Sequence, residues 1–303
     1  MPWKHWNSDR IGVALAVLAA FGFSFKAIFV KLAYAAAPVD AVTLLSLRMV
    51  FSLPAFLWIG FTAGNAAPLT RRDWGTLVVL GVLGYYASSM LDFLGLQYIS
   101  AGLERLILFT YPTLTVLIGV LFMGQSLEKR QVGALLLSYA GIGLAFAHDL
   151  QLGGDVATLL TGAAFVFGSA LTYAIYSAGA EPAIRRLGSA RFAALAMLVS
   201  TTATQLHFFA TQPLSALVQP LPIYLYGAAM ALFSTVLPIL WQSAAIRRIG
   251  AARSVLIGTL GPVLTIFFSW WLLQEPVSAA QLAGAGLVLA GVLLVSRSKR
   301  KPA

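Results

Sequence analysis

The chain of 303 residues contains no cysteine, which excludes disulfide bonds and thiol chemistry. It has only three histidines, His5, His148 and His207, and they lie too far apart in the sequence to indicate a metal site. Glycine-rich phosphate loops, dinucleotide-binding motifs and nucleophile elbows are also missing. These absences predict that the chain has no catalytic residues, binds no cofactor and is not an enzyme.

Charged residues are scarce as well. They make up 10% of the chain, against 59% hydrophobic residues, and the mean hydropathy is +0.86. A chain of this composition is unable to bury its apolar surface in one water-soluble core, so we place it in a lipid bilayer. A membrane-spanning helix needs about 20 mostly apolar residues. We predict an all-α integral membrane protein with ten such helices, at about residues 11–34, 40–62, 74–96, 101–123, 131–147, 156–178, 190–211, 222–245, 251–273 and 279–296.

The chain also repeats itself. Residues 99–144 match residues 249–294 without a gap, with twelve identities in forty-six positions where composition alone gives about four. The shared core is Leu106-Ile107, Pro112 and Leu114-Thr115 against Leu256-Ile257, Pro262 and Leu264-Thr265. We expect two repeats, residues 1–150 and 151–303, with five helices each. Because five is odd, the second repeat enters the membrane from the opposite side, an inverted arrangement typical of transporters that alternate their access.

Lysine and arginine fall on one side of the ten predicted helices. Since these residues resist translocation in short loops, we expect both termini in the cytoplasm and the chain in a bacterial inner (plasma) membrane. The net charge of +10 is spread over six short segments, which indicates topology and contact with membrane lipid and argues against nucleic acid. These segments hold Lys4 and Arg10, Arg71-Arg72, Lys129-Arg130, Arg185-Arg186-Arg191, Arg247-Arg248, and the tail with Arg297, Lys299, Arg300 and Lys301.

Polar side chains inside the third and eighth spans form two predicted stripes. In the third span the residues recur at helical spacing, and an offset of 150 gives their counterparts in the eighth. Two stripes that face each other would line a polar pathway between the repeats; the alternative is hydrogen bonding between helices without a ligand. The stripes are Gly81, Tyr85, Ser88 and Asp92, and Ala231, Thr235, Pro238 and Gln242.

Two prolines lie at equivalent depths of the fourth and ninth spans. Pro112 and Pro262 each fall about eleven residues into a span, near the bilayer midplane. A proline removes one helical hydrogen bond, so each proline predicts a kink that either lets a half-helix swing as a gate or is purely structural. Three tyrosines, Tyr85 of the third span, Tyr111 of the fourth and Tyr173 of the sixth, are candidates to line a wide cavity.

Few charges fall inside the spans. Lys26 lies in the first span and Arg48 in the second. Among the carboxylates only Asp92 and Glu104 fall within a span, and both lie toward the outer face. Lys26 is predicted to bind a substrate carboxylate. The alternatives are that Lys26 extends toward the interface and that Arg48 pairs with a carbonyl or with Glu104. Because no carboxylate lies at the midplane, we expect transport that does not respond to pH.

The fifth and tenth spans carry pairs of small residues, Gly141 with Ala145 and Gly286 with Ala290. Such pairs let helices approach closely. They indicate either peripheral packing helices or the contact of a homodimer.

Several motifs together resemble a known family. Its EamA-type repeat, in the drug/metabolite transporter superfamily, has a midspan proline, a turn and a following glutamine and glycine, as in Gly124-Gln125-Ser126-Leu127 with Gln131 and Gly133, and Gln274-Glu275-Pro276-Val277 with Gln281 and Gly284. Phe21-Gly22-Phe23-Ser24, Pro38 and Leu45-Ser46-Leu47-Arg48 are similar to its first two spans. Gln125 replaces the family's usual glutamate, which makes a role for that carboxylate in both repeats doubtful.

Within the family the chain looks like the YddG-type amino-acid exporters. The resemblance implies two inverted five-helix repeats, a central cavity and export of small metabolites, here amino acids with an apolar or aromatic side chain. A carrier of a drug, nucleoside or sugar phosphate, and more remotely a membrane enzyme or a receptor, remain alternatives. The stripes and tyrosines, not the resemblance, give the predicted substrate-binding residues: Lys26, Tyr85, Ser88, Asp92, Tyr111, Tyr173, Thr235 and Gln242, with Pro112 and Pro262 as gating residues.

Overall fold

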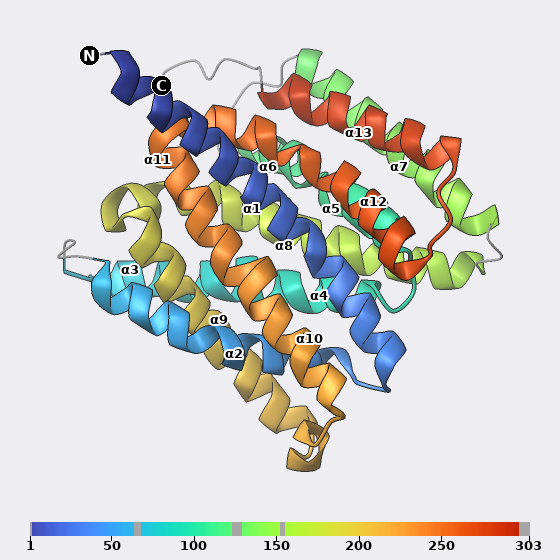
Figure 1. Ribbon diagram of the computed structural model, residues 1–303, viewed down its shortest axis with the longest axis horizontal. Helices are drawn as coiled ribbons and strands as arrows, with labels where there is room; N and C mark the ends of the chain where they lie inside the picture. Colours follow the sequence, from blue (N-terminus) through green and yellow to red (C-terminus); the bar gives the residue numbers. More distant parts are fainter. Residues whose placement is uncertain (1, 64–67, 123–128, 152–154, 297–303) are drawn as a thin grey trace.

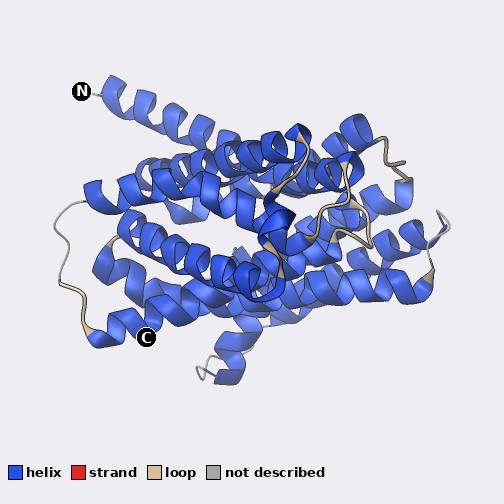
Figure 2. Ribbon diagram, turned by 90° about the horizontal axis from the view of Figure 1, so that it is seen from below, coloured by secondary structure: helices blue, strands red, loops and turns tan. Residues whose placement is uncertain are grey.

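A computed structural model describes residues 2–63, 68–122, 129–151 and 155–296. Within these ranges the regular structure is entirely helical, with no strand (Figure 2). The basic tail from Arg297 and the turn around Gln125 lie outside the described residues. The predicted all-α architecture is confirmed.

The helices follow one another as ten passages through the molecule. The first repeat contains α1 (Pro2–Ala36), α2 (Ala41–Thr62), α3 (Arg71–Gly81), the π-helix η1 (Val82–Ala87), α4 (Ser88–Gly95), α5 (Ala101–Leu108), α6 (Tyr111–Phe122) and α7 (Lys129–Gln151). The second contains α8 (Val156–Leu187), α9 (Ser189–Thr211), the short 3₁₀ helix η2 (Leu214–Leu217), α10 (Leu221–Ala231), the π-helix η3 (Leu232–Val236), α11 (Leu237–Gly258), α12 (Leu260–Leu273) and α13 (Ala279–Ser296).

Eight helical segments of the described chain are long and apolar enough to cross a membrane, and two shorter apolar helices, α12 and α13, complete the ten. α11 bends at Gly250, whose φ of 80° and ψ of 160° favour glycine. The eighth passage (α10, η3 and α11 up to Gly250) ends at this bend, and the ninth passage consists of the rest of α11 and α12. The residues after this bend continue toward α12. α1 begins and α13 ends on the same side of the molecule (Figure 1), as an even number of passages requires.

The two repeats share their irregularities. The π-helices η1 and η3 start at residues 82 and 232, which are 150 positions apart. The fourth and ninth passages are both interrupted, between α5 and α6 and again at Thr259. Pro112 is the second residue of α6 and Pro262 the third of α12, positions where a helix needs no backbone donor from the residue. Each interruption therefore immediately precedes a proline.

Polar side chains cap the N-termini of three helices on the side of the molecule where the predicted loops lack basic residues. Asp40 and Asp155 accept hydrogen bonds from the backbone of Thr43 and Thr158, and Ser100 accepts one from Leu103. These contacts satisfy helix N–H groups that have no partner within the helix.

α1 lies at the centre of one face, packed along α11 and α12, whereas α7 and α13 run side by side at the edge (Figure 1). Gly141 of α7 lies against the Gly284 carbonyl and Val288 of α13, so this small residue serves contact within the chain. Around Gly286 the space is open. Peripheral packing thus accounts for Gly141, and a homodimer through these helices stays a prediction.

Replacing Gly141 with leucine should separate α7 from α13, because its side chain would meet the Gly284 backbone. Overpacking of this kind costs about 1–3 kcal/mol, which thermal unfolding in detergent would detect as a lower midpoint. Gly143→Leu is the matched control, since nothing lies within 4 Å of a Cβ there. Equal midpoints for the two variants would contradict the tight α7–α13 contact.

Candidate functional site

Four tyrosines from three passages form one aromatic cluster halfway along the spans. Tyr85 of η1 contacts Tyr176 of α8 at 5.1 Å between ring centroids, and their hydroxyls hydrogen-bond at 3.0 Å. Tyr176 lies 5.4 Å from Tyr173, which lies 4.9 Å from Tyr111 at the start of α6. The three tyrosines predicted from the sequence are thus brought together.

The prediction omitted Tyr176. The sequence could have indicated Tyr176, because it follows Tyr173 by three residues and therefore lies on the same face of the helix. Gly84 allows the close approach of this ring, since a Cβ at Gly84 would overlap Tyr176.

The hydroxyls of this cluster differ in their bonding. The hydroxyls of Tyr85 and Tyr176 bond each other, whereas those of Tyr111 and Tyr173 make no hydrogen bond to any described residue, and both side chains are only half-buried. A hydroxyl at mid-span without a partner is costly in an apolar setting. Tyr111 and Tyr173 are therefore the members of the cluster that are free to bond a ligand.

The Phe21-Gly22-Phe23-Ser24 segment of α1 is held between both repeats. Gly22 accommodates Pro238 and the Phe233 carbonyl of the eighth passage. The Phe23 carbonyl accepts a hydrogen bond from Arg105 at 3.1 Å, and the Ser24 hydroxyl donates one to the Gly261 carbonyl at 3.1 Å. A Cβ at Gly261 would lie 3.2 Å from the ring of Phe109, so the two interrupted passages meet beside Ser24.

A cluster of four charges, Lys26, Asp92, Glu104 and Arg105, joins α1, α4 and α5. Lys26 Nζ lies 2.8 Å from Asp92 Oδ2 and 3.9 Å from Glu104 Oε1, and Arg105 Nε lies 3.6 Å from Glu104 Oε2. Both carboxylate side chains are 0% exposed, while that of Lys26 is 17% exposed. The alternative in which Lys26 extends toward the interface is wrong, because its ammonium binds these acids instead.

Arg48 does not pair as predicted. Its Nη2 donates to Ser89 Oγ at 2.8 Å, and its guanidinium lies 5.1 Å from the centre of the Phe93 ring. The sequence suggested a carbonyl or Glu104 as its partner, but Glu104 is flanked by Lys26 and Arg105 instead. Arg105, which follows Glu104 directly, was missed as a buried charge.

The two polar stripes do not face each other. In the third passage a Cβ at Gly81 would meet α9, whereas Ser88 bonds Ser169 of α8 at 3.0 Å and Asp92 points to α1. In the eighth passage Pro238 lies against α1. The prediction that one stripe lines one face is wrong because the π-helix η1 shifts the helical phase between Gly81 and Ser88.

The remaining stripe residues have different surroundings. Thr235 donates to the Met230 carbonyl, five residues earlier in its own passage, at 3.0 Å. The side chain of Gln242 is half-buried, and its amide makes no hydrogen bond to the described part of the chain. Of the two, only Gln242 therefore has its polar group available.

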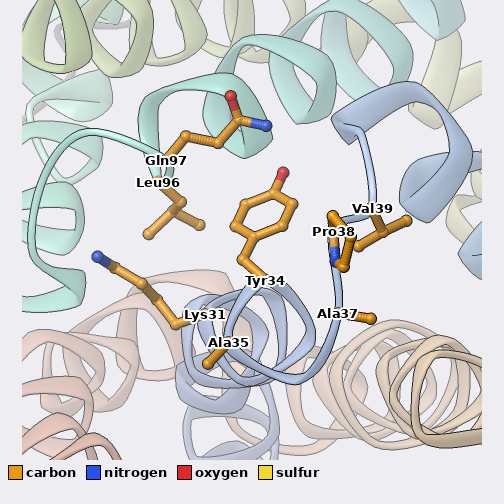
Figure 3. Close-up of a pocket in the computed structure, with 8 residues that line it drawn as sticks. All are labelled: Lys31, Tyr34, Ala35, Ala37, Pro38, Val39, Leu96 and Gln97. Atoms are coloured by element: carbon orange, nitrogen blue, oxygen red, sulfur yellow. The ribbon is translucent and has the colours of Figure 1, made fainter. Parts of the chain in front are cut away.

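A pocket of about 420 Å³ opens where α1 ends and α4 meets α5. Figure 3 shows the hydroxyl of Tyr34 directed toward the Gln97 amide, with the Lys31 ammonium on the other side of Leu96. Lys31 also lies 3.6 Å from Glu275, which accepts a hydrogen bond from the Ala101 backbone at 3.1 Å. Burial raises the pKa of the Glu275 carboxyl, against the effect of Lys31 and of the Ala101 N–H.

The described residues contain no group of three or more histidines and acids that would hold a metal ion. Ligand binding in this part of the chain therefore rests on the tyrosine cluster, the four charges and the backbone around the two interruptions.

Comparisons with known proteins give the chain its relatives. It is 29% identical, over 91% of its length and 89% of the relative's, to the uncharacterized transporter YcbK of Bacillus subtilis. It is 25% identical over 75% of its length, and 74% of the relative's, to a probable terminal-alkyne amino-acid exporter of Streptantibioticus cattleyicolor. A UDP-xylose transporter of Arabidopsis thaliana is 28% identical over 74% of this chain and 66% of that protein.

A solved crystal structure has the same fold, with a TM-score of 0.65 at 18% identity, and the match covers 93% of this chain and 95% of the other. The model of the EamA-like transporter family matches this chain twice, at residues 10–147 and 160–297. Together these matches cover most of the sequence. The chain is a multi-pass membrane transporter and belongs to the EamA-like transporter family.

Proposed function

We propose that the protein exports amino acids with an apolar or aromatic side chain from the cytoplasm. The observation that carries the proposal is the tyrosine cluster, in which Tyr111 and Tyr173 present unpartnered hydroxyls beside aromatic rings. Aromatic faces bind an apolar side chain, and hydroxyls orient the polar end of the same molecule. A relative named as an exporter of terminal-alkyne amino acids supports this substrate class, because an alkyne is an apolar group.

The cluster of four charges suits a zwitterion. Lys26 is the cation for the substrate carboxylate, and Asp92 is the anion for its ammonium group. Ser88 and Thr235 already bond Ser169 and Met230, so we assign them supporting roles. The residues proposed to contact the substrate are Lys26, Tyr85, Asp92, Tyr111, Tyr173 and Gln242, with Ser88 and Thr235 in support.

Alternating access would use the two interrupted passages. Pro112 and Pro262 each start a half-helix, and the interruptions meet at Phe109 and Gly261. A hinge needs few residues that absorb a change of backbone angles. We assign Pro112 and Pro262 to gating between the repeats 1–150 and 151–303.

Orientation and assembly follow the same proposal. The basic ends of α3, α8 and α11 would face the cytoplasm of a bacterial cell together with both termini. A homodimer would use the open surface at Gly286 and not the occupied one at Gly141.

A second candidate is a carrier of nucleotide sugars or sugar phosphates, which the name of the Arabidopsis relative favours. Such a substrate carries more negative charge than an amino acid. Competition separates the two candidates: unlabelled phenylalanine and leucine should suppress transport of labelled phenylalanine, whereas UDP-sugars should not.

The double variant Tyr111→Phe/Tyr173→Phe tests the site. It keeps both rings and removes both free hydroxyls, so efflux of radiolabelled phenylalanine from proteoliposomes should fall about tenfold or more, the effect of about 1.4 kcal/mol in binding. Tyr139→Phe on α7 is the matched control, because Tyr139 is exposed on a peripheral helix. If the double variant transported at the control rate, the tyrosine hydroxyls would not bind substrate.

A further inference from the structure

The buried acids Asp92 and Glu104 are the part of the site that the proposed function does not fully use. Both flank the same nitrogen, Lys26 Nζ, and both side chains are 0% exposed. The expectation that transport ignores pH rested on the absence of carboxylates at the midplane. The structure instead places two carboxylates deep inside the protein, toward its outer side.

Glu104 differs from Asp92 in its contacts. Asp92 is bound by Lys26 at 2.8 Å, whereas the distances from Glu104 to Lys26 and Arg105 are 3.9 and 3.6 Å. All four carboxylate oxygens of the pair are fully buried and lack a hydrogen-bond partner among the described residues, so the two acids differ only in their distances to the cations. Protonation of Glu104 therefore disturbs only these looser contacts, whereas protonation of Asp92 would break its 2.8 Å ion pair with Lys26.

The pair has a short route to the outer side. Leu96 and Gln97, which line the outer pocket of about 420 Å³, lie one turn beyond Asp92 along the same passage (Figure 3). Lys31 and Tyr34 line the same pocket and follow Lys26 on α1. Water in this pocket would be separated from the acids by about one helical turn.

Other charged and titratable groups lie on the helices and loops around the pair Asp92 and Glu104. Ser169 of α8 faces Ser88, one turn before Asp92, and Tyr173 lies one turn further along α8. The groups are Lys26, Lys31 and Tyr34 on α1, Arg48 on α2, Arg105 on α5, Asp149 at the end of α7, and Glu275 after α12. With both acids ionised, Lys26 and Arg105 balance them, so one added proton leaves an uncompensated positive charge.

The pair already holds a primary ammonium group. Lys26 Nζ is the same chemical group as the α-ammonium of an amino acid, which would therefore find the same two acceptors. The second repeat lacks these acids, because the positions 150 residues later are Gln242 and Ser254. The proton site would thus exist once per chain.

We propose that Asp92 and Glu104 form a proton-binding site that couples export to proton entry, because a proton and the substrate's ammonium group compete for the pair. From the outer side an O–H bond forms on one of the carboxylates, which weakens binding of the ammonium group and favours release of the amino acid. On the cytoplasmic side the arriving ammonium group takes the acceptor, the O–H bond breaks and the proton leaves to water. The inference rests on the proposed function.

Proteoliposomes test the coupling separately from transport. Counterflow of radiolabelled phenylalanine at equal pH on both sides reports transport alone. Uptake of the label into vesicles that are acidic inside reports coupling, because protons that leave the vesicle would drive phenylalanine inward by antiport. With a gradient of one pH unit the wild-type protein should accumulate the label up to about tenfold above the level without a gradient, the limit for one-for-one exchange. An ionophore that collapses the gradient should remove this accumulation.

The decisive variant is Glu104→Gln, which removes one of the two acceptors: counterflow should weaken but stay measurable because Asp92 is kept, whereas the accumulation should be lost. Asp155→Asn is the matched control, because Asp155 is an exposed helix cap and asparagine also caps helices. Wild-type counterflow that is unchanged by the gradient would overturn the proton site, and so would normal accumulation by Glu104→Gln. Absence of counterflow for every amino acid would instead overturn the proposed substrate class.

A measurement on the wild-type protein covers the case in which Glu104→Gln fails to fold. Competition predicts that the half-saturating phenylalanine concentration in counterflow rises by up to about tenfold per pH unit of acidification, with an unchanged maximal rate. 3-Phenylpropionate, the same molecule without its amino group, should compete weakly and equally at each pH. A half-saturating concentration that is independent of pH would contradict the proposal.

Discussion

Replacement of Lys26 with methionine is expected to destabilise the protein by about 3–5 kcal/mol, the cost of breaking a buried ion pair on one side. Asp92 would lose its 2.8 Å partner, and Arg105 alone would remain for two carboxylates that are 0% exposed. Thermal unfolding in detergent should show a much lower midpoint, and phenylalanine counterflow should be lost.

The double variant Lys26→Met/Asp92→Asn separates stability from transport. It removes both charges of the pair, so most of the lost stability should return. Counterflow should not return, because the groups proposed to bind both ends of the zwitterion are then absent. A Lys26→Met protein that is as stable and as active as the wild type would show that the ion pair is unimportant.

Substitution of Gly84 with alanine is the second change with a large expected effect. The new Cβ would overlap the ring of Tyr176, which lies directly against the η1 backbone. Since Tyr176 contacts both Tyr85 and Tyr173, its displacement should disturb the whole cluster. We expect transport of phenylalanine to fall about tenfold or more, the effect of 1.4 kcal/mol or more of lost binding.

Gly75→Ala is the control for this substitution, because nothing lies within 4 Å of a Cβ at Gly75 in the same passage. The combination Gly84→Ala/Tyr176→Gly removes the overlap, including that with the Tyr176 Cβ at 2.7 Å, so the unfolding midpoint should recover in part while transport stays low. If Gly84→Ala alone transported phenylalanine like Gly75→Ala, the close packing of Tyr176 would have no role in transport.

Most of the fold was predictable from the sequence because the information is carried along the chain. Long apolar runs set the helices, and the offset of 150 sets the equivalence of the halves. Pro112 and Pro262 marked the interruptions of the fourth and ninth passages, since proline disfavours the interior of a helix. The tyrosines Tyr111 and Tyr173 were also placed in one site.

The rotation of each helix was less predictable. The spacing of Gly81, Ser88 and Asp92 assumed 3.6 residues per turn, and the π-helix η1 changes this phase within the stripe. Partners of buried charges depend on such rotations, so the sequence alone left the pairing of Arg48 and of Lys26 undetermined. Hydrophobicity also concealed Arg105, because a single charge near the start of an apolar span does not interrupt the run.

The most direct test of the account is counterflow of radiolabelled phenylalanine in proteoliposomes that contain the purified protein. We predict saturable exchange that unlabelled phenylalanine and leucine suppress and UDP-sugars leave unchanged. Exchange that UDP-sugars suppress, or no exchange of any amino acid, would contradict the proposal that this EamA-like transporter exports apolar amino acids.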